Sequence, residues 1–188
     1  MLKRYLALSL LIIILNVSFI FAENLELGFK EFGVYSGFMK GDLDQKDDYE
    51  LVPLILRFGF DLRPLLKNKS NNLIEFMIEP FINTVISPDP NLESGCSFLL
   101  KFAPAIKEKF YPYIEGGMGM VHLTQQTREQ ATQFNFFESL GMGITYFLKK
   151  NLTLNLGYRY RHISNASIKR PNKGIDTNLF ICGVSFFY

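Results

Sequence analysis

Three residues near the C-terminus carry the chemistry that a serine esterase needs. Ser164 supplies a hydroxyl nucleophile, His162 a base to deprotonate it, and Asp176 a carboxylate to hold the base in one tautomer. His162 and Ser164 are two positions apart, so both project from the same face of a strand. Asp176 lies in the next predicted strand, and a hairpin would bring the three groups together. The alternative is that they are ordinary polar groups at the rim of a β-structure.

A basic cluster lies between these residues. Lys169, Arg170 and Lys173 fall in the loop between Ser164 and Asp176. Basic side chains at the rim of a membrane protein bind phosphate groups, and the alternative here is a solvated loop. No cysteine and histidine cluster has metal-ligand spacing, so we expect no metal and no cofactor.

The segments around these residues alternate as β-strands do. Residues 151–164 place Leu, Tyr, His and Ser at even positions, and Thr, Asn, Gly and Arg at odd positions. The same split recurs at 52–60, 73–86, 92–102 and 134–148, although Phe137 and Glu138 break it. Residues 25–38 alternate poorly, and their faces stay unassigned. Charged residues on the polar face are expected to form a structural network rather than a channel: Arg57, Glu75, Glu79, Glu115, Arg159 and Arg161.

Eight strands are predicted, at residues 25–38, 49–60, 73–86, 92–104, 110–123, 133–148, 151–163 and 175–188. Many exceed the ~9–11 residues that a strand needs to cross a bilayer, and closure removes edges that lipid cannot satisfy. We therefore predict an all-β fold, an eight-stranded antiparallel transmembrane β-barrel of the outer membrane. A soluble β-sandwich is the alternative.

The predicted strands also fix the connections. With both termini in the periplasm, residues 39–48, 87–91, 124–132 and 164–174 form outer loops. The connection at 61–72 would be an unusually long inner one.

The N-terminus has the pattern of a secretory signal. Lys3 and Arg4 precede an apolar stretch at 5–21 and then Ala22, which predicts a signal peptide at residues 1–22 and a single barrel domain at 23–188. An uncleaved membrane anchor is the alternative. The chain has 20 basic and 18 acidic residues, and removing the two bases of the signal leaves 18 of each. We expect no nucleic-acid partner.

The two cysteines are too few for a disulfide framework. Cys96 and Cys182 fall in the fourth and eighth predicted strands, which stand on opposite sides of an eight-stranded ring. We expect both to stay unpaired, because a disulfide needs Cα atoms within ~7 Å.

Several short motifs resemble one known family. The stretch His162-Ile163-Ser164-Asn165-Ala166, followed by Pro171-Asn172-x-Gly174-Ile175, resembles the signature of the PagL family of lipid A 3-O-deacylases. Upstream motifs appear in the family's order: Pro112-Tyr113-Ile114-Glu115-Gly116-Gly117-x-Gly119, Phe134-Asn135-Phe136 and Gly157-Tyr158-Arg159.

The resemblance implies an outer-membrane esterase that hydrolyses the acyl chain at position 3 of lipid A. Lipopolysaccharide is then the substrate and outer-membrane lipid the surroundings. By position, Ser164 matches the nucleophile, His162 the general base and Asn165 a residue of the oxyanion hole. Asp176 stands where the family commonly has glutamate, and Ser167 where it usually has glycine.

Two other functions stay open at this point. A non-catalytic barrel, adhesin-like or structural, would work through its loops at 39–48 and 124–132. A lipid A acyltransferase would need an acyl acceptor other than water. The oligomeric state is also open, with a homodimer among the alternatives.

Overall fold

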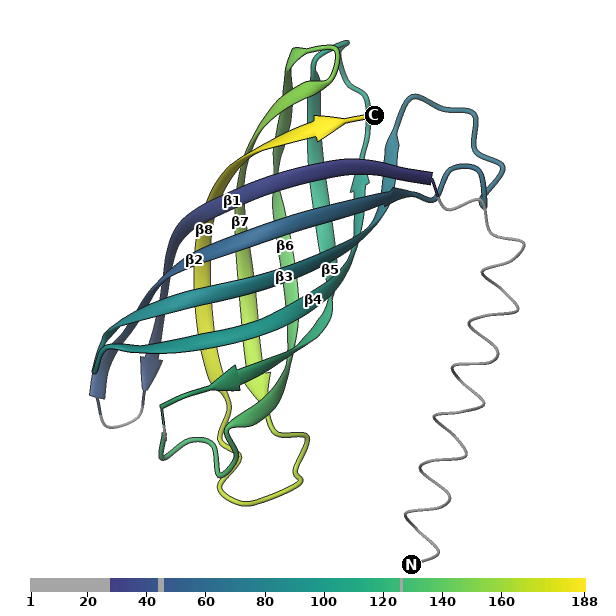
Figure 1. Ribbon diagram of the computed structural model, residues 1–188. Helices are drawn as coiled ribbons and strands as arrows, with labels where there is room; N and C mark the ends of the chain where they lie inside the picture. Colours follow the sequence, from purple (N-terminus) through teal and green to yellow (C-terminus); the bar gives the residue numbers. More distant parts are fainter. Residues whose placement is uncertain (1–27, 44–45, 126) are drawn as a thin grey trace, which may run out of the picture.

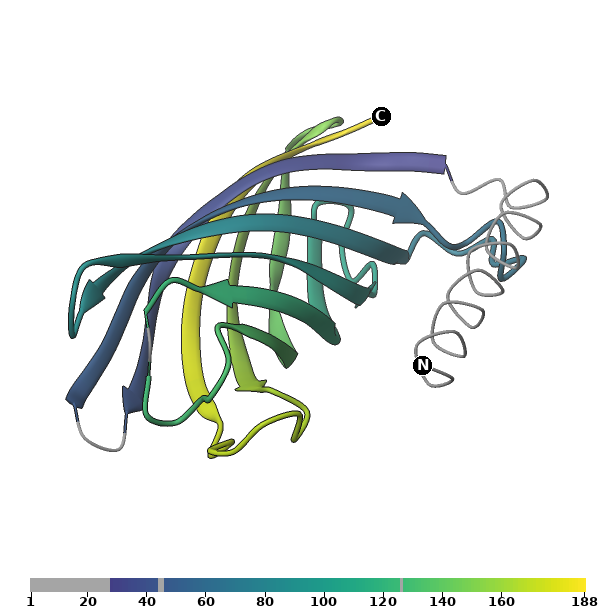
Figure 2. The same cartoon turned by 60° about the horizontal axis from the view of Figure 1, so that its bottom comes forward.

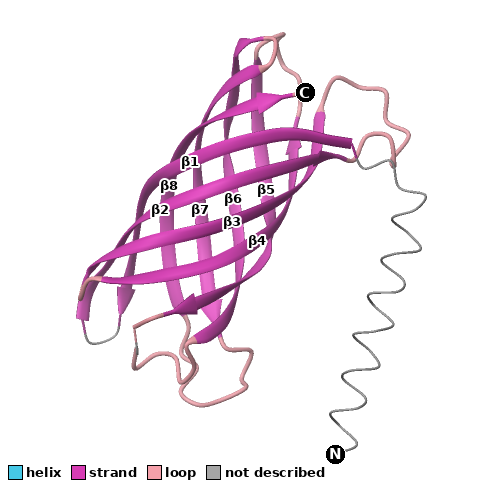
Figure 3. Cartoon of the chain, in the orientation of Figure 1, coloured by secondary structure: helices cyan, strands magenta, loops and turns pink. Residues whose placement is uncertain are grey.

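The computed structural model describes residues 28–43, 46–125 and 127–188, so the predicted signal peptide at 1–22 lies outside the described residues. Each strand pairs antiparallel with the next, and β1 pairs with β8 to close the ring (Figures 1 and 3). The predicted eight-stranded barrel is confirmed. The strands are β1 (Gly28–Leu43), β2 (Lys46–Asp61), β3 (Leu73–Ser87), β4 (Asn91–Ala103), β5 (Phe110–Leu123), β6 (Phe134–Lys149), β7 (Leu152–Ser164) and β8 (Ile175–Phe187).

Within the described residues, no helix has the length and apolar character required to cross a membrane.

Side chains alternate between the outside and the inside of the barrel. On β7, Leu154 and Leu156 are exposed, whereas Thr153 and Asn155 are buried. The faces predicted for residues 151–164 are therefore correct. The same parity holds on β1, where the sequence left the faces unassigned, because odd positions there point inward.

The first hairpin differs from the prediction. The outer loop expected at 39–48 is wrong, because β1 runs to Leu43 and β2 begins at Lys46. Met39 pairs with Leu51, and a Lys40–Asp48 ion pair of 2.7 Å lies on the outward side. The inward side chains of this hairpin are buried in the hydrophobic core, so the ladder continues although its outward residues are polar: Met39, Leu43, Tyr49 and Leu51.

Buried charges fill the middle of the barrel. Arg159 on β7 donates to Glu79 on β3 at 2.7 Å and to Glu115 on β5 at 2.6 Å. Arg57 on β2 also donates to Glu79, at 2.6 Å. All four side chains are almost fully buried. The predicted structural charge network is therefore present, and it ties four strands together across the lumen.

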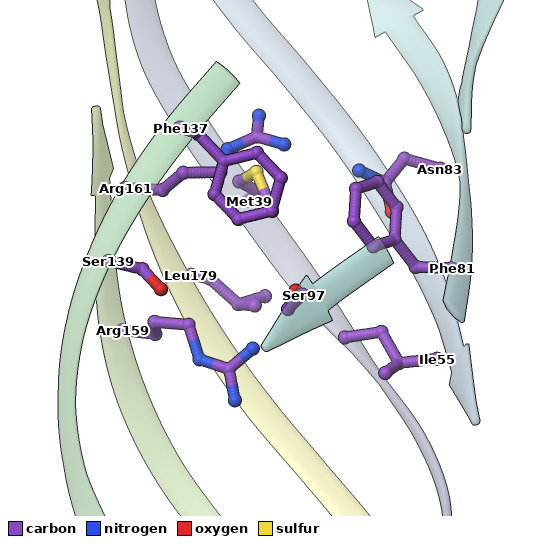
Figure 4. A pocket seen from close by; sticks show the side chains of 10 residues that line it. All are labelled: Met39, Ile55, Phe81, Asn83, Ser97, Phe137, Ser139, Arg159, Arg161 and Leu179. Atoms are coloured by element: carbon purple, nitrogen blue, oxygen red, sulfur yellow. The ribbon is translucent and has the colours of Figure 1, made fainter. Parts of the chain in front are cut away.

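A second layer of buried polar groups lies nearer the end of β7. Arg161 donates to Glu93 on β4 at 3.0 Å, and Tyr49 donates to the same carboxylate. Between the two layers lies an internal cavity of about 20 Å³, which Figure 4 shows lined by Arg159 and Arg161 among others. That volume is roughly the space of one water molecule. The side chains therefore fill this part of the lumen and leave no room for a wide channel.

The two cysteines are free, as predicted. Cys96 lies on β4 and Cys182 on the outward face of β8, on opposite sides of the ring.

A substitution in the charge network tests its structural role. Arg159→Met removes the guanidinium but keeps an unbranched side chain. Glu79 and Glu115 then remain buried with less positive charge beside them. Removing one partner of a buried ion pair typically costs ~3–5 kcal/mol. We expect the free energy of unfolding, measured by urea titration in phospholipid vesicles, to fall by about that amount. Lys150→Met in an exposed turn is the control and should change it by less than ~0.5 kcal/mol. Equal stability of both variants would contradict the role of the network.

Candidate active site

His162 and Asp176 face each other across the β7–β8 hairpin. The two residues are direct register partners, and both point outward because their neighbours Ile163 and Ile175 are buried. The distance from His162 Nδ1 to Asp176 Oδ1 is 2.5 Å. An ionised carboxylate only accepts hydrogen bonds, so Nδ1 carries the proton and Nε2 is left as the acceptor. This is the tautomer that a general base requires.

Two further polar side chains adjoin this pair. Tyr160 lies within hydrogen-bonding reach of the Asp176 carboxylate, from the same outward face of β7. Glu138 on β6 is the register partner of His162 on its other side. Sequence reasoning assigned no role to either residue, although the break in the alternation at Glu138 marked that position as unusual. That break arises because Phe137 points inward and packs on Phe81, with ring centroids 5.9 Å apart.

Ser164 ends β7 on the same outward face as His162. Its register partner on β6 is Phe136. Among the described residues, the Ser164 hydroxyl has no hydrogen-bond partner. Hydrogen bonds of a catalytic hydroxyl often tighten only when substrate is bound. The fold therefore places the three predicted groups at one rim, with the His162–Asp176 contact already formed.

Asn165 organises the loop that follows. Its backbone N–H donates to Asn172 Oδ1 at 2.8 Å. Its side-chain amide donates to the carbonyls of Lys169 at 2.8 Å and Pro171 at 3.3 Å. Because these bonds use its donors, the fully buried Asn165 holds the 165–174 loop in shape in this conformation.

The backbone of this loop adopts unusual conformations. Ala166 and Ser167 have φ values of 51° and 60°, in the left-handed region. Serine therefore keeps at position 167 the conformation that glycine adopts freely, at a strain cost of ~1–3 kcal/mol. The N–H groups of Ala166 and Ser167 have no hydrogen-bond partner among the described residues. They are available to a ligand beside Ser164.

Gly174 packs directly against the His162 imidazole. Its φ is +84°, and a Cβ added there would lie 2.5 Å from His162 Cε1. Any side chain at this position would therefore displace the ring. The sequence contained this glycine in a family motif but did not show what it contacts.

The neighbouring outer loop supports the site. Lys173 N donates to Glu129 O at 2.9 Å, and Ala131 N donates to Pro171 O at 3.0 Å. Gln130, which is buried, forms an isolated antiparallel β-bridge with Asn172. These bonds join the 165–174 loop to the β5–β6 loop (Figure 1). The predicted basic residues Lys169, Arg170 and Lys173 lie on the exposed side of the joined loops.

Comparison with known proteins gives a family. The sequence matches the lipid A 3-O-deacylase (PagL) family over residues 53–185. The comparison with curated protein sequences gave no match. The crystal structure of the outer membrane enzyme PagL is 18% identical and superposes with a TM-score of 0.61, covering 81% of this chain and 97% of that one. Neisserial surface protein A is 12% identical, with a TM-score of 0.66 over 87% of this chain and 100% of that one. At these identities the two structures support the fold alone.

Gly174 offers a test of the site geometry. Gly174→Ala should push the His162 ring away from its position, and a displacement of ~1 Å can cost ~100-fold in rate. We expect at least that loss of ester hydrolysis, measured on detergent-dispersed lipid A, while the circular dichroism spectrum stays that of a barrel. Ser167→Gly is the control, because it relieves left-handed strain and should retain activity. Full activity of Gly174→Ala would show that the close contact is unimportant.

Proposed function

Because the chain belongs to the lipid A 3-O-deacylase (PagL) family, we propose that it cleaves the acyl ester at position 3 of lipid A by a mechanism using Ser164, His162 and Asp176. The protein is an outer-membrane β-barrel and an ester hydrolase. The observation that carries the mechanism is the 2.5 Å contact between His162 and Asp176, with Ser164 two residues further along the same outward face. The proposal rests on that geometry together with the family match.

In the proposed reaction, His162 Nε2 takes the proton of Ser164 as its Oγ attacks the ester carbonyl carbon. The imidazolium that forms is stabilised by Asp176, and it then returns the proton to the departing sugar oxygen. Water attacks the acyl-enzyme with the same base, which releases a fatty acid and restores Ser164. Tyr160 would help to keep the Asp176 carboxylate turned toward His162.

The oxyanion would be stabilised by backbone donors. The N–H groups of Ala166 and Ser167 lie two and three residues after Ser164 and have no other partner among the described residues. Preorganised donors of this kind stabilise the charge that develops on the ester oxygen. Asn165, which the resemblance assigns to the oxyanion hole, would act by holding the loop that presents them.

The outward placement suits a lipid substrate. Phe134, Phe136 and Phe180 are exposed on the wall around the site and would contact acyl chains directly. The ester would then reach Ser164 from within the membrane, at the leaflet that contains lipopolysaccharide. Lys169, Arg170 and Lys173 at the exposed loop would bind the phosphates of lipid A.

Substitution of the three groups tests the mechanism. We expect Ser164→Ala and His162→Ala each to lower the rate of fatty acid release by roughly 10⁶-fold, and Asp176→Ala by roughly 10⁴-fold, because an orienting carboxylate costs least to remove. Mass spectrometry of lipid A and of the released fatty acid measures this directly. The appearance of free fatty acid also separates hydrolysis from acyl transfer.

The matched control for the nucleophile is Ser94→Ala, since Ser94 is another exposed serine, on β4 and away from the site. It should keep full activity. A well-folded Ser164→Ala variant as active as Ser94→Ala would rule out the serine mechanism.

A separate prediction concerns the basic residues of the 165–174 loop. In a Lys169→Gln/Arg170→Gln double variant, KM for phosphorylated lipid A should rise about fivefold or more per charge removed, with kcat nearly unchanged, because these groups bind rather than react. Lipid A from which the phosphates have been removed is the control substrate, on which variant and parent should have the same KM. Equal effects on both substrates would mean that the loop does not bind phosphate.

A further inference from the structure

The connection between β2 and β3 is a hydrogen-bonded turn at the end of the barrel opposite to the active site. Residues 62–72 begin with a helical turn, in which Leu66 N donates to Leu62 O at 3.0 Å. Arg63 fixes the turn, because it binds Asp61 at 2.7 Å and the carbonyl of Ser70 at 3.4 Å. Figure 2 shows this connection extending from the barrel beside the start of β1. Its length exceeds what joining two neighbouring strands requires.

An apolar groove of about 450 Å³ lies between this turn and the outer wall of the barrel. Leu62 and Leu66 form one side of it. Outward side chains of β3 to β6 form most of the other side: Ile74, Leu100, Phe102, Ile114 and Leu140. Three buried charged residues of the same strands also border the groove: Glu75, Lys101 and Glu115. Gly116 lines the groove beside Leu140 and has no side chain to fill the space; a Cβ added there would lie 3.3 Å from Leu140 Cδ1. The volume is within the range of small-molecule sites, and the lining suits a hydrocarbon chain.

The turns at this end of the barrel are basic. The turns at 62–72, 104–109 and 149–151 expose six lysines and one acidic residue, Glu108. The lysines are Lys67, Lys69, Lys107, Lys109, Lys149 and Lys150. Among the described residues, no acidic side chain forms an ion pair with Lys67 or Lys69. Asn72 accepts a hydrogen bond from Ala105 N at 3.0 Å, which holds the first two turns together.

We propose that this groove binds an anionic glycerophospholipid of the leaflet opposite to lipopolysaccharide, with an acyl chain along Leu62, Leu66 and Gly116 and the headgroup phosphate at Lys67 and Lys69. The apolar groove and the exposed lysines that follow Leu66 in the same turn match the two parts of such a lipid. Each lysine near a membrane surface favours an anionic lipid by roughly fivefold. A zwitterionic lipid could fill the groove but would gain much less from the lysines. The site is separate from ester hydrolysis and does not depend on it.

The test uses full-length protein refolded into vesicles of equal phosphatidylglycerol and phosphatidylcholine. The protein is released in mild detergent, and native mass spectrometry gives the ratio of the two lipids that remain bound. We expect the parent protein to retain phosphatidylglycerol at least about fivefold over phosphatidylcholine, and Lys67→Gln/Lys69→Gln to bring the ratio near one. Gly116→Leu, which fills the groove, should lower the retention of both lipids.

Matched variants separate a local site from general attraction. Lys149→Gln/Lys150→Gln removes the same charge at the same end but away from the groove, and should keep most of the preference. Val184→Phe enlarges an outward side chain on β8 and should leave lipid retention unchanged. Heat-modifiable migration on gels and lipid A hydrolysis in detergent should be normal for all four variants. A parent ratio near one, or equal losses from the two lysine pairs, would overturn the proposal.

Discussion

The buried ion pairs of Arg159 with Glu79 and Glu115 fix the register on which the outer surface depends. A slip of β7 by one residue would turn Arg159 toward lipid, where an arginine at mid-membrane costs ~2–4 kcal/mol. It would also remove the positive charge of Arg159 from two buried carboxylates. Because inward and outward positions alternate, holding Arg159 and Arg161 inside places His162 and Ser164 outside. The charge network in the lumen therefore determines the face on which these two candidate residues lie.

The parts of this structure that follow from alternation could be predicted from the sequence. A two-residue period assigns faces without knowledge of the partner strand, and so the outward His162 and Ser164 and the inward Arg57 and Glu79 were predicted correctly. The strand count followed in the same way. The prediction for the first hairpin was wrong because Gly41, Asp42 and their neighbours have a composition that is typical of loops. The outward positions there, Lys40 and Asp42, are polar, and composition on that face no longer separates strand from loop.

The remaining features of the site depend on contacts between segments that a single sequence does not relate. Glu138 becomes a neighbour of His162 only through the register of β6 on β7. The left-handed conformation of Ser167 survives because Asn165 and Asn172 bind the loop around it. Gly174 contacts the imidazole because the loop turns back over β7. In each case the residue type was visible, but its partner was not.

Asp176 shows how strand pairing compensates for a short side chain. Directly opposed residues on one face of an antiparallel pair have Cβ atoms only ~4.5–5.5 Å apart. An aspartate at that position reaches the His162 imidazole directly, whereas a glutamate would have to fold back its extra methylene. Tyr160 lies within hydrogen-bonding reach of the same carboxylate from the adjacent outward position. The contact between Asp176 and His162 is therefore set by the register of β7 on β8, and the same register is held by the charges on the inner side of the wall.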